Sequence, residues 1–225
     1  MTGIIGAMTR EIEGIRSMLK DAETVKIGPM TFTTGKIGNE PVVVAVCGIG
    51  KVFAGICAQT MIYRFHPDRI LNVGVGGALD PDLQICDVVV ADFVVQHDMD
   101  TSALGDPKGM ISGLNIVRIP CDGDLAEKIR LAAADAGLRV RNGVIASGDR
   151  FLSSAAEKQA VRETFSASVC EMEGAAVGQV CYYNGVPFCV VRSISDGSGD
   201  GGEMDYFAFC SVAAANTERI LEKLF

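Results

Sequence analysis

Apolar residues along this chain follow two patterns that alternate from one end to the other. Short continuous apolar runs predict strands buried in a sheet, and apolar residues spaced three or four positions apart predict helices that bury one face. The predicted strands cover residues 2–8, 30–36, 41–47, 69–75, 86–95, 140–147 and 187–196, with a further short one ending near Glu171. The predicted helices cover residues 10–20, 52–65, 124–136 and 155–165, a segment ending near 184 and one ending at 225. This alternation predicts one α/β domain over residues 1–225, a three-layer αβα arrangement around a mixed, largely parallel sheet.

Polar and glycine-rich segments follow several of the predicted strands. Glu171 and Glu173 flank Met172 where a short strand gives way to a helix, and the last strand ends in Arg192, Ser195 and Asp196. Open α/β sheets bind ligands at the carboxyl ends of their strands, so these side chains are candidates for one site. The alternative is that the two glutamates are only first-turn acids that stabilise a helix dipole.

Two glycine segments are similar to nucleotide-binding loops but do not match them. The segment Gly48–Lys51 is not a P-loop, because Ala45 and Val52 stand where a glycine and a hydroxyl residue are required. The segment Gly74–Ala78 is not a dinucleotide fingerprint, because Leu79 replaces the third glycine. Each segment is therefore either a tight turn or a backbone cradle for a small ligand.

The composition indicates a globular protein and argues against a nucleic-acid-binding or membrane-spanning one. With 48% apolar and 21% charged residues among 225, the chain can bury a sizeable core. The net charge of −8 argues against a nucleic-acid partner. No apolar run reaches the roughly 18 residues of a membrane-spanning helix, and the first residues lack the basic lead of a signal peptide. Eight scattered cysteines without a CxxC pair favour a reducing compartment, so we expect a cytoplasmic protein.

The polar segment 97–109 contains His97, Asp98 and Asp100, which are possible metal ligands. One histidine and two aspartates in a turn-rich segment form a weak pattern, and the chain has only two histidines. We therefore expect no metal site and no cofactor. Long loops in compact α/β domains are often functional, so the segment is predicted to be a lid or a contact to a partner.

Five short segments, taken in order, resemble the 5′-methylthioadenosine/S-adenosylhomocysteine nucleosidases of the nucleoside phosphorylase/hydrolase superfamily. They are Gly3–Met8 with Glu11, Gly48–Lys51, Ser147–Asp149 with Phe151, Glu171–Glu173 and Val190–Asp196. The resemblance covers nearly the whole chain. It implies the phosphorylase/hydrolase-like α/β fold and an irreversible hydrolysis that releases adenine and a 5-thio-substituted ribose. It also implies small adenine nucleosides as ligands and a homodimer.

The resemblance implies a role for each matching residue. Asp196 matches the general acid that protonates purine N7, Glu11 matches the group that activates water, and Arg192 would help hold that water. An anomeric C–N bond breaks through an oxocarbenium-like state, so both proton transfers are needed. The implied substrate contacts are Glu173 and Glu171 near the ribose, Met172 on the sugar, Phe151 and Leu152 at the adenine, Gly77 and Ser195 beside them, and Ile49, Leu104 and Phe209 at the alkylthio group.

The chain departs from the family pattern at two places. Val75 stands where a hydroxyl residue is common, and Leu104 and Asp106 stand where aromatic residues are common. Val75 also disfavours the alternative of a phosphorylase, because a phosphate needs donors and positive charge around the glycine segment. A non-catalytic binder would need neither Glu11 nor Asp196. An aminofutalosine hydrolase shares the whole catalytic set and stays an open alternative.

Overall fold

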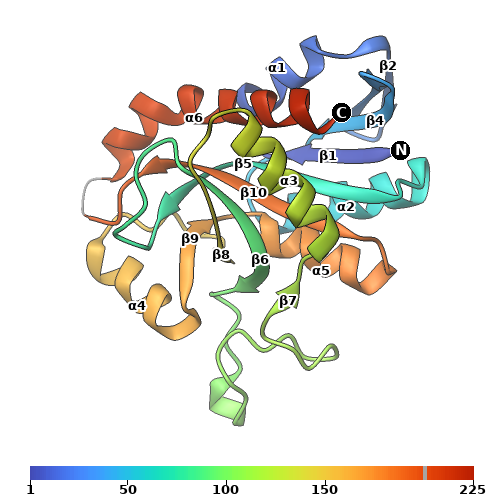
Figure 1. Ribbon diagram of the computed structural model, residues 1–225. Helices are drawn as coiled ribbons and strands as arrows, with labels where there is room; N and C mark the ends of the chain where they lie inside the picture. Colours follow the sequence, from blue (N-terminus) through green and yellow to red (C-terminus); the bar gives the residue numbers. More distant parts are fainter. Residues whose placement is uncertain (200–201) are drawn as a thin grey trace.

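The computed structural model describes residues 1–199 and 202–225. Within this part of the chain all strands join one sheet, and helices cover it on both sides (Figure 1). The strands are β1 Thr2–Gly6, β2 Lys20–Ile27, β3 Met30–Ile37, β4 Glu40–Val46, β5 Arg69–Ala78, β6 Val88–Gln96, β7 Ile119–Pro120, β8 Val140–Ser147, β9 Ala167–Glu171 and β10 Phe188–Asp196. The helices are α1 Thr9–Ser17, α2 Lys51–Phe65, α3 Gly123–Asp135, α4 Ala155–Phe165, α5 Gly174–Asn184 and α6 Gly202–Leu224, with a short 3-10 helix η1 Ser102–Leu104.

The sheet is mixed, as predicted, and it also closes on itself. Strand β5 pairs in parallel with β1 and β10 and antiparallel with β9. The pairs β10–β6, β6–β8 and β8–β9 complete a ring, from which β1, β4, β3 and β2 extend as an open sheet. The predicted strand ended at Val75, with residues 74–78 as a turn or a backbone cradle, but β5 continues to Ala78 and includes the whole glycine segment. A Cβ at Gly76 would lie 2.6 Å from Val169 Cγ1, so glycine lets β9 approach β5 closely enough to close the ring.

Two hydrophobic cores lie on opposite faces of the sheet and hold the helices there. Helices α1, α3 and α6 pack on one face, and α2 and α5 pack together on the other (Figure 1). Strand β10 is buried along its whole length between these layers, and β5 is buried after its first residue. The three-layer αβα arrangement is therefore confirmed, and it fixes the ends of β5 and β10 inside the protein.

Two strands were not predicted, namely the two-residue β7 and the longer β2. The helix predicted over residues 10–20 ends at Ser17, and the chain continues as β2, which pairs antiparallel with β3. Strand β2 lies at the edge of the sheet and most of its residues are exposed. It therefore needs no apolar alternation, and its polar sequence carries no strand pattern.

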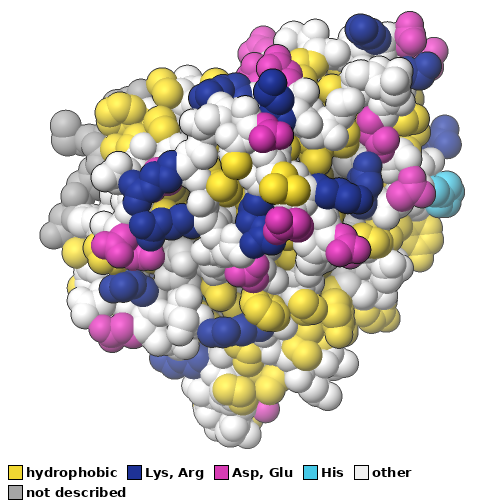
Figure 2. Space-filling view, in the orientation of Figure 1, with side chains coloured by type: hydrophobic (Ala, Val, Ile, Leu, Met, Phe, Trp, Pro, Cys, Tyr) yellow, Lys and Arg dark blue, Asp and Glu magenta, His cyan; other side chains and the backbone are white. Residues whose placement is uncertain are grey.

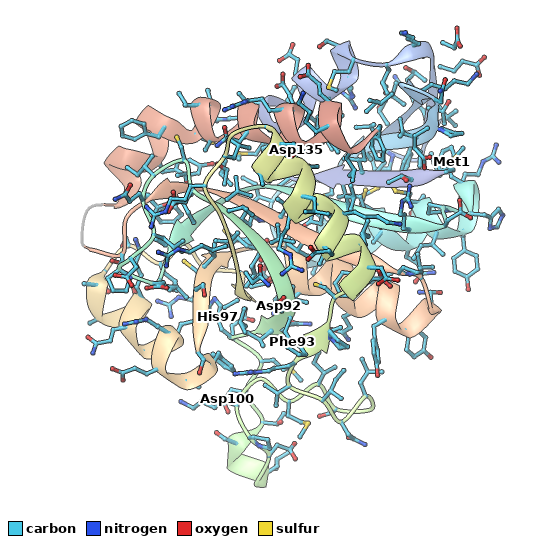
Figure 3. All side chains as sticks on the ribbon, in the orientation of Figure 1. Met1, Asp92, Phe93, His97, Asp100 and Asp135 are labelled. Carbon is cyan, nitrogen blue, oxygen red and sulfur yellow. The ribbon has the colours of Figure 1, made fainter. Side chains whose placement is uncertain are left out.

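The segment between β6 and β7 projects from the body of the protein. Figure 3 shows His97 where this segment leaves the sheet and Asp100 further along it. Leu104, in η1, has 84% of its surface exposed. In the described part of the chain, no helix combines the length and the apolar character that crossing a membrane requires.

Candidate active site

A cavity of about 290 Å³ opens where β5, β9 and β10 end beside the starts of α1 and α2. Most of the residues that line it were predicted from the sequence. The predicted residues that line it are Glu11, Ile49, Gly77, Phe151, Leu152, Glu171, Met172, Glu173, Ser195 and Asp196. Its other lining residues are Ala7, Met8, Val75, Gly76, Arg150, Cys170 and Tyr206.

Glu11 is a buried carboxylate held by three backbone donors. It lies in the first turn of α1, where its Oε2 accepts hydrogen bonds from the N–H groups of Ala7 and Met8, each at 2.8 Å. Its Oε1 accepts from the Val75 N–H at 3.1 Å. Burial raises the pKa of the Glu11 carboxyl, against the opposing effects of Arg192 and these N–H groups. A buried carboxylate with a raised pKa is suited to take a proton near neutral pH.

The backbone of β5 makes room for two of the carboxylates. A Cβ at Gly74 would lie 2.5 Å from Glu11 Oε1, and a Cβ at Gly77 would lie 2.7 Å from Asp196 Oδ2. The glycine segment is therefore a close-packed surface against which Glu11 and Asp196 lie. This explains a run of glycines that matches neither nucleotide-binding pattern.

Glu171 is engaged entirely by the protein. Its carboxylate accepts hydrogen bonds from the Ser147 hydroxyl, from Nη2 of Arg192, and from the N–H groups of Glu173 at 3.1 Å and Gly174 at 2.7 Å. These bonds place its charge at the start of α5, where a helix dipole favours it. The geometry gives Glu171 a supporting position rather than one free to bind a ligand.

Arg192 lies beneath the cavity and not in its wall. Its guanidinium donates to the side-chain oxygen of Asn72 at 2.5 Å and to the carboxylate of Glu171. Burial by itself lowers the pKa of Arg192, but Glu171, Glu173 and Glu11 together raise it above its ordinary value. Arg192 is therefore the permanent cation that offsets the charge of the surrounding glutamates.

Glu173 joins the end of β9 to the turn before α2. It is the N-cap residue of α5, and its Oε1 accepts the Gly50 N–H at 2.7 Å. Gly50 has φ 101°, a conformation that favours glycine and lets its N–H point at the carboxylate. Burial, followed by the charge of Glu171, raises the pKa of Glu173 to about 7. Glu173 therefore changes charge within the physiological range.

The raised pKa of Glu173 predicts a pH-dependent loss on substitution. An ionised carboxylate accepts hydrogen bonds more strongly than a protonated one, and the wild-type group becomes increasingly protonated as the pH falls through about 7. Glu173→Gln should therefore lower kcat/KM more at pH 8 than at pH 6. The same substitution should raise Tm more at pH 8 than at pH 5, because the folded protein then no longer bears a buried charge. Equal losses of kcat/KM at pH 6 and pH 8 would contradict the raised pKa of Glu173.

Asp196 is the buried last residue of β10. Its Oδ1 accepts a hydrogen bond from the Ser195 hydroxyl at 2.9 Å, and its Oδ2 accepts one from Nζ of Lys158 at 3.0 Å. Lys158 comes from α4 and was not among the predicted site residues. Helical spacing could place it on α4, but only the fold brings α4 against the end of β10.

Apolar side chains close the rest of the cavity. Phe151 lies edge-on to the ring of Tyr206, with centroids 5.8 Å apart at 76°. Leu152, Met172 and Met8 add further apolar surface. Aromatic rings in this arrangement can stack on a planar heterocycle. Tyr206 belongs to the amphipathic pattern of α6, which does not distinguish a cavity residue from a core residue.

Two predicted substrate contacts do not line the cavity of a single chain. Leu104 lies on the projecting segment, and Phe209 lies on the partly exposed side of α6. Asp98, one of the possible metal ligands, is engaged by the protein instead. It pairs with Nζ of Lys51 at 2.5 Å and accepts the Asp149 N–H at 2.9 Å. Among the described residues, no three histidine, cysteine, aspartate or glutamate side chains come together as a metal site.

Known proteins match this chain over its whole length. The family model described as the phosphorylase superfamily matches residues 2–225. A 5′-methylthioadenosine/S-adenosylhomocysteine nucleosidase of Staphylococcus aureus (strain JH9) is 36% identical over 225 residues, covering 100% of this chain and 98% of the relative.

Two solved structures have nearly the same fold. A 5′-methylthioadenosine/S-adenosylhomocysteine nucleosidase from Neisseria meningitidis, in complex with methylthio-immucillin-A, superposes with a TM-score of 0.95 at 32% identity, covering 99% of this chain and 97% of that chain. The native futalosine hydrolase of Helicobacter pylori strain 26695 superposes with a TM-score of 0.94 at 37% identity, covering 99% of this chain and 96% of that chain.

Proposed function

Because this chain belongs to the 5′-methylthioadenosine/S-adenosylhomocysteine nucleosidase family of the phosphorylase superfamily, we propose that it hydrolyses the N-ribosidic bond of these two nucleosides. The products are adenine and a 5-thio-substituted ribose. The observation that carries the proposal is the pair of buried carboxylates, Glu11 and Asp196, in the wall of one small and mostly apolar cavity. One is held by backbone N–H groups and the other by a lysine and a serine.

The two carboxylates divide the proton transfers between them. Asp196 gives a proton to purine N7, and the electron pair of the breaking C1′–N9 bond moves into the purine ring. Glu11 takes a proton from a water molecule while the water oxygen bonds to C1′. Nε of Arg192 has no hydrogen-bond partner among the described residues, so it is available to a buried water beside Glu11.

The remaining residues bind the substrate. Glu173 accepts hydrogen bonds from the ribose hydroxyls, and Met172 packs on the sugar. Phe151 stacks on the adenine, whose edge meets the backbone of Leu152 and Gly77. Glu171 acts from behind this surface, because its oxygens already accept hydrogen bonds from the protein.

The charges around the cavity favour water over phosphate as the nucleophile. Four of its lining residues are carboxylates, namely Glu11, Glu171, Glu173 and Asp196. Arg150 is the one lysine or arginine among the described lining residues, and its guanidinium already pairs with Glu157. A phosphate dianion would meet like charges without a matching cluster of cations.

The similarity to a solved futalosine hydrolase supports a futalosine derivative as the alternative substrate. That structure has nearly the same TM-score to this chain as the Neisseria meningitidis nucleosidase. We would measure adenine release from methylthioadenosine, S-adenosylhomocysteine, adenosine and 6-amino-6-deoxyfutalosine in phosphate-free buffer. Release from the first two at the highest kcat/KM supports the proposal. A higher kcat/KM for the futalosine derivative would assign the protein to the alternative, and no release from any of the four would reject both.

We also infer that the protein is a homodimer whose interface includes the first turns of α2. One side of α2 is buried in the core through Ala54, Cys57 and Met61. The other side is also apolar, and it exposes Val52, Phe53 and Ile56, with Ile49 just before the helix. A helix that is apolar on both sides is normally covered on both sides.

A second copy of the chain is the occupant that these positions favour. Ile49 belongs both to the exposed apolar side and to the cavity lining, so a partner there would complete the cavity wall. The projecting segment with the exposed Leu104 provides a protrusion for such a contact. Figure 2 shows hydrophobic side chains among mixed charges on the lower part of the molecule, toward this segment.

Val52→Asp should convert the dimer to a monomer and raise KM. Val52 is 71% exposed in one chain and lies in the first turn of α2, where an aspartate is tolerated in the monomer. Leu131→Asp, on the exposed side of α3, is the matched control and should stay dimeric. Sedimentation velocity gives both masses. A wild-type protein that is already monomeric at micromolar concentration would overturn the inference.

The cytoplasm is the proposed location. The eight cysteines are free thiols, and six of them are buried. Burial raises the pKa of Cys57, Cys170 and Cys181 to about 12, so these thiols stay protonated and unreactive. Such thiols are suited to a reducing compartment.

A further inference from the structure

Lys158 is the most deeply buried cation outside the assigned catalytic set. Only 1% of its surface is exposed, although lysine is almost never fully buried without a partner. Its Nζ donates to Asp196 Oδ2 at 3.0 Å, to the Gly197 carbonyl at 2.5 Å and to the Gly199 carbonyl at 3.5 Å. All three ammonium hydrogens therefore have acceptors at the end of β10.

The contact places a full positive charge against one oxygen of the Asp196 carboxyl group. Asp196 Oδ1 accepts a hydrogen bond from Ser195, and Asp196 Oδ2 accepts one from Lys158. Both contacts favour the ionised carboxylate, and the ammonium is a full opposite charge. Oδ2 also lies against Gly77, which leaves it little freedom to turn. The arrangement suits a carboxylate that has already given up its proton.

We propose that Lys158 is a positioning residue for the general acid, which stabilises the carboxylate that Asp196 becomes when its proton passes to the purine. The inference rests on the proposed function. In that step the Asp196 O–H bond breaks and the purine N7–H bond forms. The electron pair of the O–H bond stays on the aspartate oxygen, beside the ammonium. Lys158 keeps its own proton throughout and contacts no substrate atom.

Two ligands of nearly the same shape, adenine and 9-deazaadenine, differ in whether the nitrogen at position 7 carries a hydrogen. Adenine presents an unprotonated N7 in its common tautomer, which accepts a hydrogen bond. 9-Deazaadenine carries a hydrogen at the corresponding nitrogen and donates to a carboxylate. The ionised Asp196 that Lys158 favours therefore binds 9-deazaadenine better than adenine. A lysine that only satisfied the Gly197 and Gly199 carbonyls would affect both ligands equally.

Lys158→Gln is the test, because glutamine keeps a hydrogen-bond donor and removes the charge. We expect kcat to fall roughly 10- to 100-fold with KM changed by less than about threefold. Affinity for 9-deazaadenine, measured by calorimetry, should fall at least about tenfold more than affinity for adenine. Lys158→Arg should restore part of both losses. Lys128→Gln, an exposed lysine on α3, is the matched control and should change neither.

Two results would overturn the inference. The first is an equal loss of affinity for adenine and 9-deazaadenine, and the second is a kcat for Lys158→Gln within about twofold of wild type. The ligand comparison does not depend on turnover. If the wild-type protein released no adenine, the proposed function would fail, while the ratio of the two affinities would still decide whether the charge of Lys158 stabilises a carboxylate at Asp196.

Discussion

Asp196→Asn should lower kcat for adenine release by roughly 10²- to 10⁴-fold, the range that a positioned general acid contributes. The amide cannot give a proton to purine N7, so the purine would leave as an anion. The fold should survive, because asparagine keeps an oxygen that accepts the hydrogen bond from Lys158. Single-turnover measurements with methylthioadenosine separate this loss from any change in substrate affinity.

A matched control uses the same chemical change outside the cavity. Asp135→Asn, at the exposed end of α3 and labelled in Figure 3, should leave kcat, KM and Tm unchanged. Asp196→Asn should bind methylthioadenosine within a few-fold of wild type. If Asp196→Asn kept kcat within tenfold of wild type, another group would have to be the acid.

Glu11→Gln should remove the general base and lower kcat by roughly 10²- to 10⁴-fold as well. Here a loss of stability accompanies the loss of rate. Both Glu11 oxygens accept backbone N–H groups, so an amide must turn a donor toward either Val75 or the Ala7–Met8 pair. An unsatisfied buried donor costs about 1–3 kcal/mol of unfolding free energy. Denaturant unfolding and steady-state kinetics measure the two effects separately.

The pH dependence of Glu11 has a definite sign. Burial raises the pKa of this carboxyl, and only its ionised form accepts a proton from water. Activity should therefore fall as the pH decreases through the raised pKa. Glu13→Gln, an exposed residue of the same helix, should keep the wild-type profile and stability. Unchanged kcat in Glu11→Gln would contradict the assignment of the base.

The strand ends are the part of the site that a sequence can predict. Apolar runs reveal the strands, and parallel strands bring their carboxyl ends to one edge of a sheet. For this reason the strand ends singled out Glu171 and Asp196 as candidates, and the family resemblance added Glu11 and Gly77. The family resemblance is confirmed by the match over residues 2–225. The functional roles of the individual residues stay predictions.

Partnerships between distant elements could not be predicted in the same way. Lys158 and Asp196 are 38 positions apart, and Asn72 and Arg192 are 120 apart. No local pattern encodes such pairs. The closure of the sheet has the same origin, because it depends on which strands β5 meets and not on any strand's own sequence. The edge strand β2 was missed for a different reason. Most of its residues are exposed, and an exposed strand needs no apolar pattern by which it could be recognised.

In the proposed reaction water, and not phosphate, attacks C1′. The direct measurement is the sugar product formed from methylthioadenosine in a buffer containing about 50 mM phosphate, which lies well above the typical KM range of about 1 μM to 1 mM. Mass spectrometry and ³¹P NMR distinguish free 5-methylthioribose from its 1-phosphate. We expect only the free sugar, at a rate equal to that without phosphate. Formation of the sugar 1-phosphate, or a rate that rises with phosphate, would make the protein a phosphorylase and contradict the account.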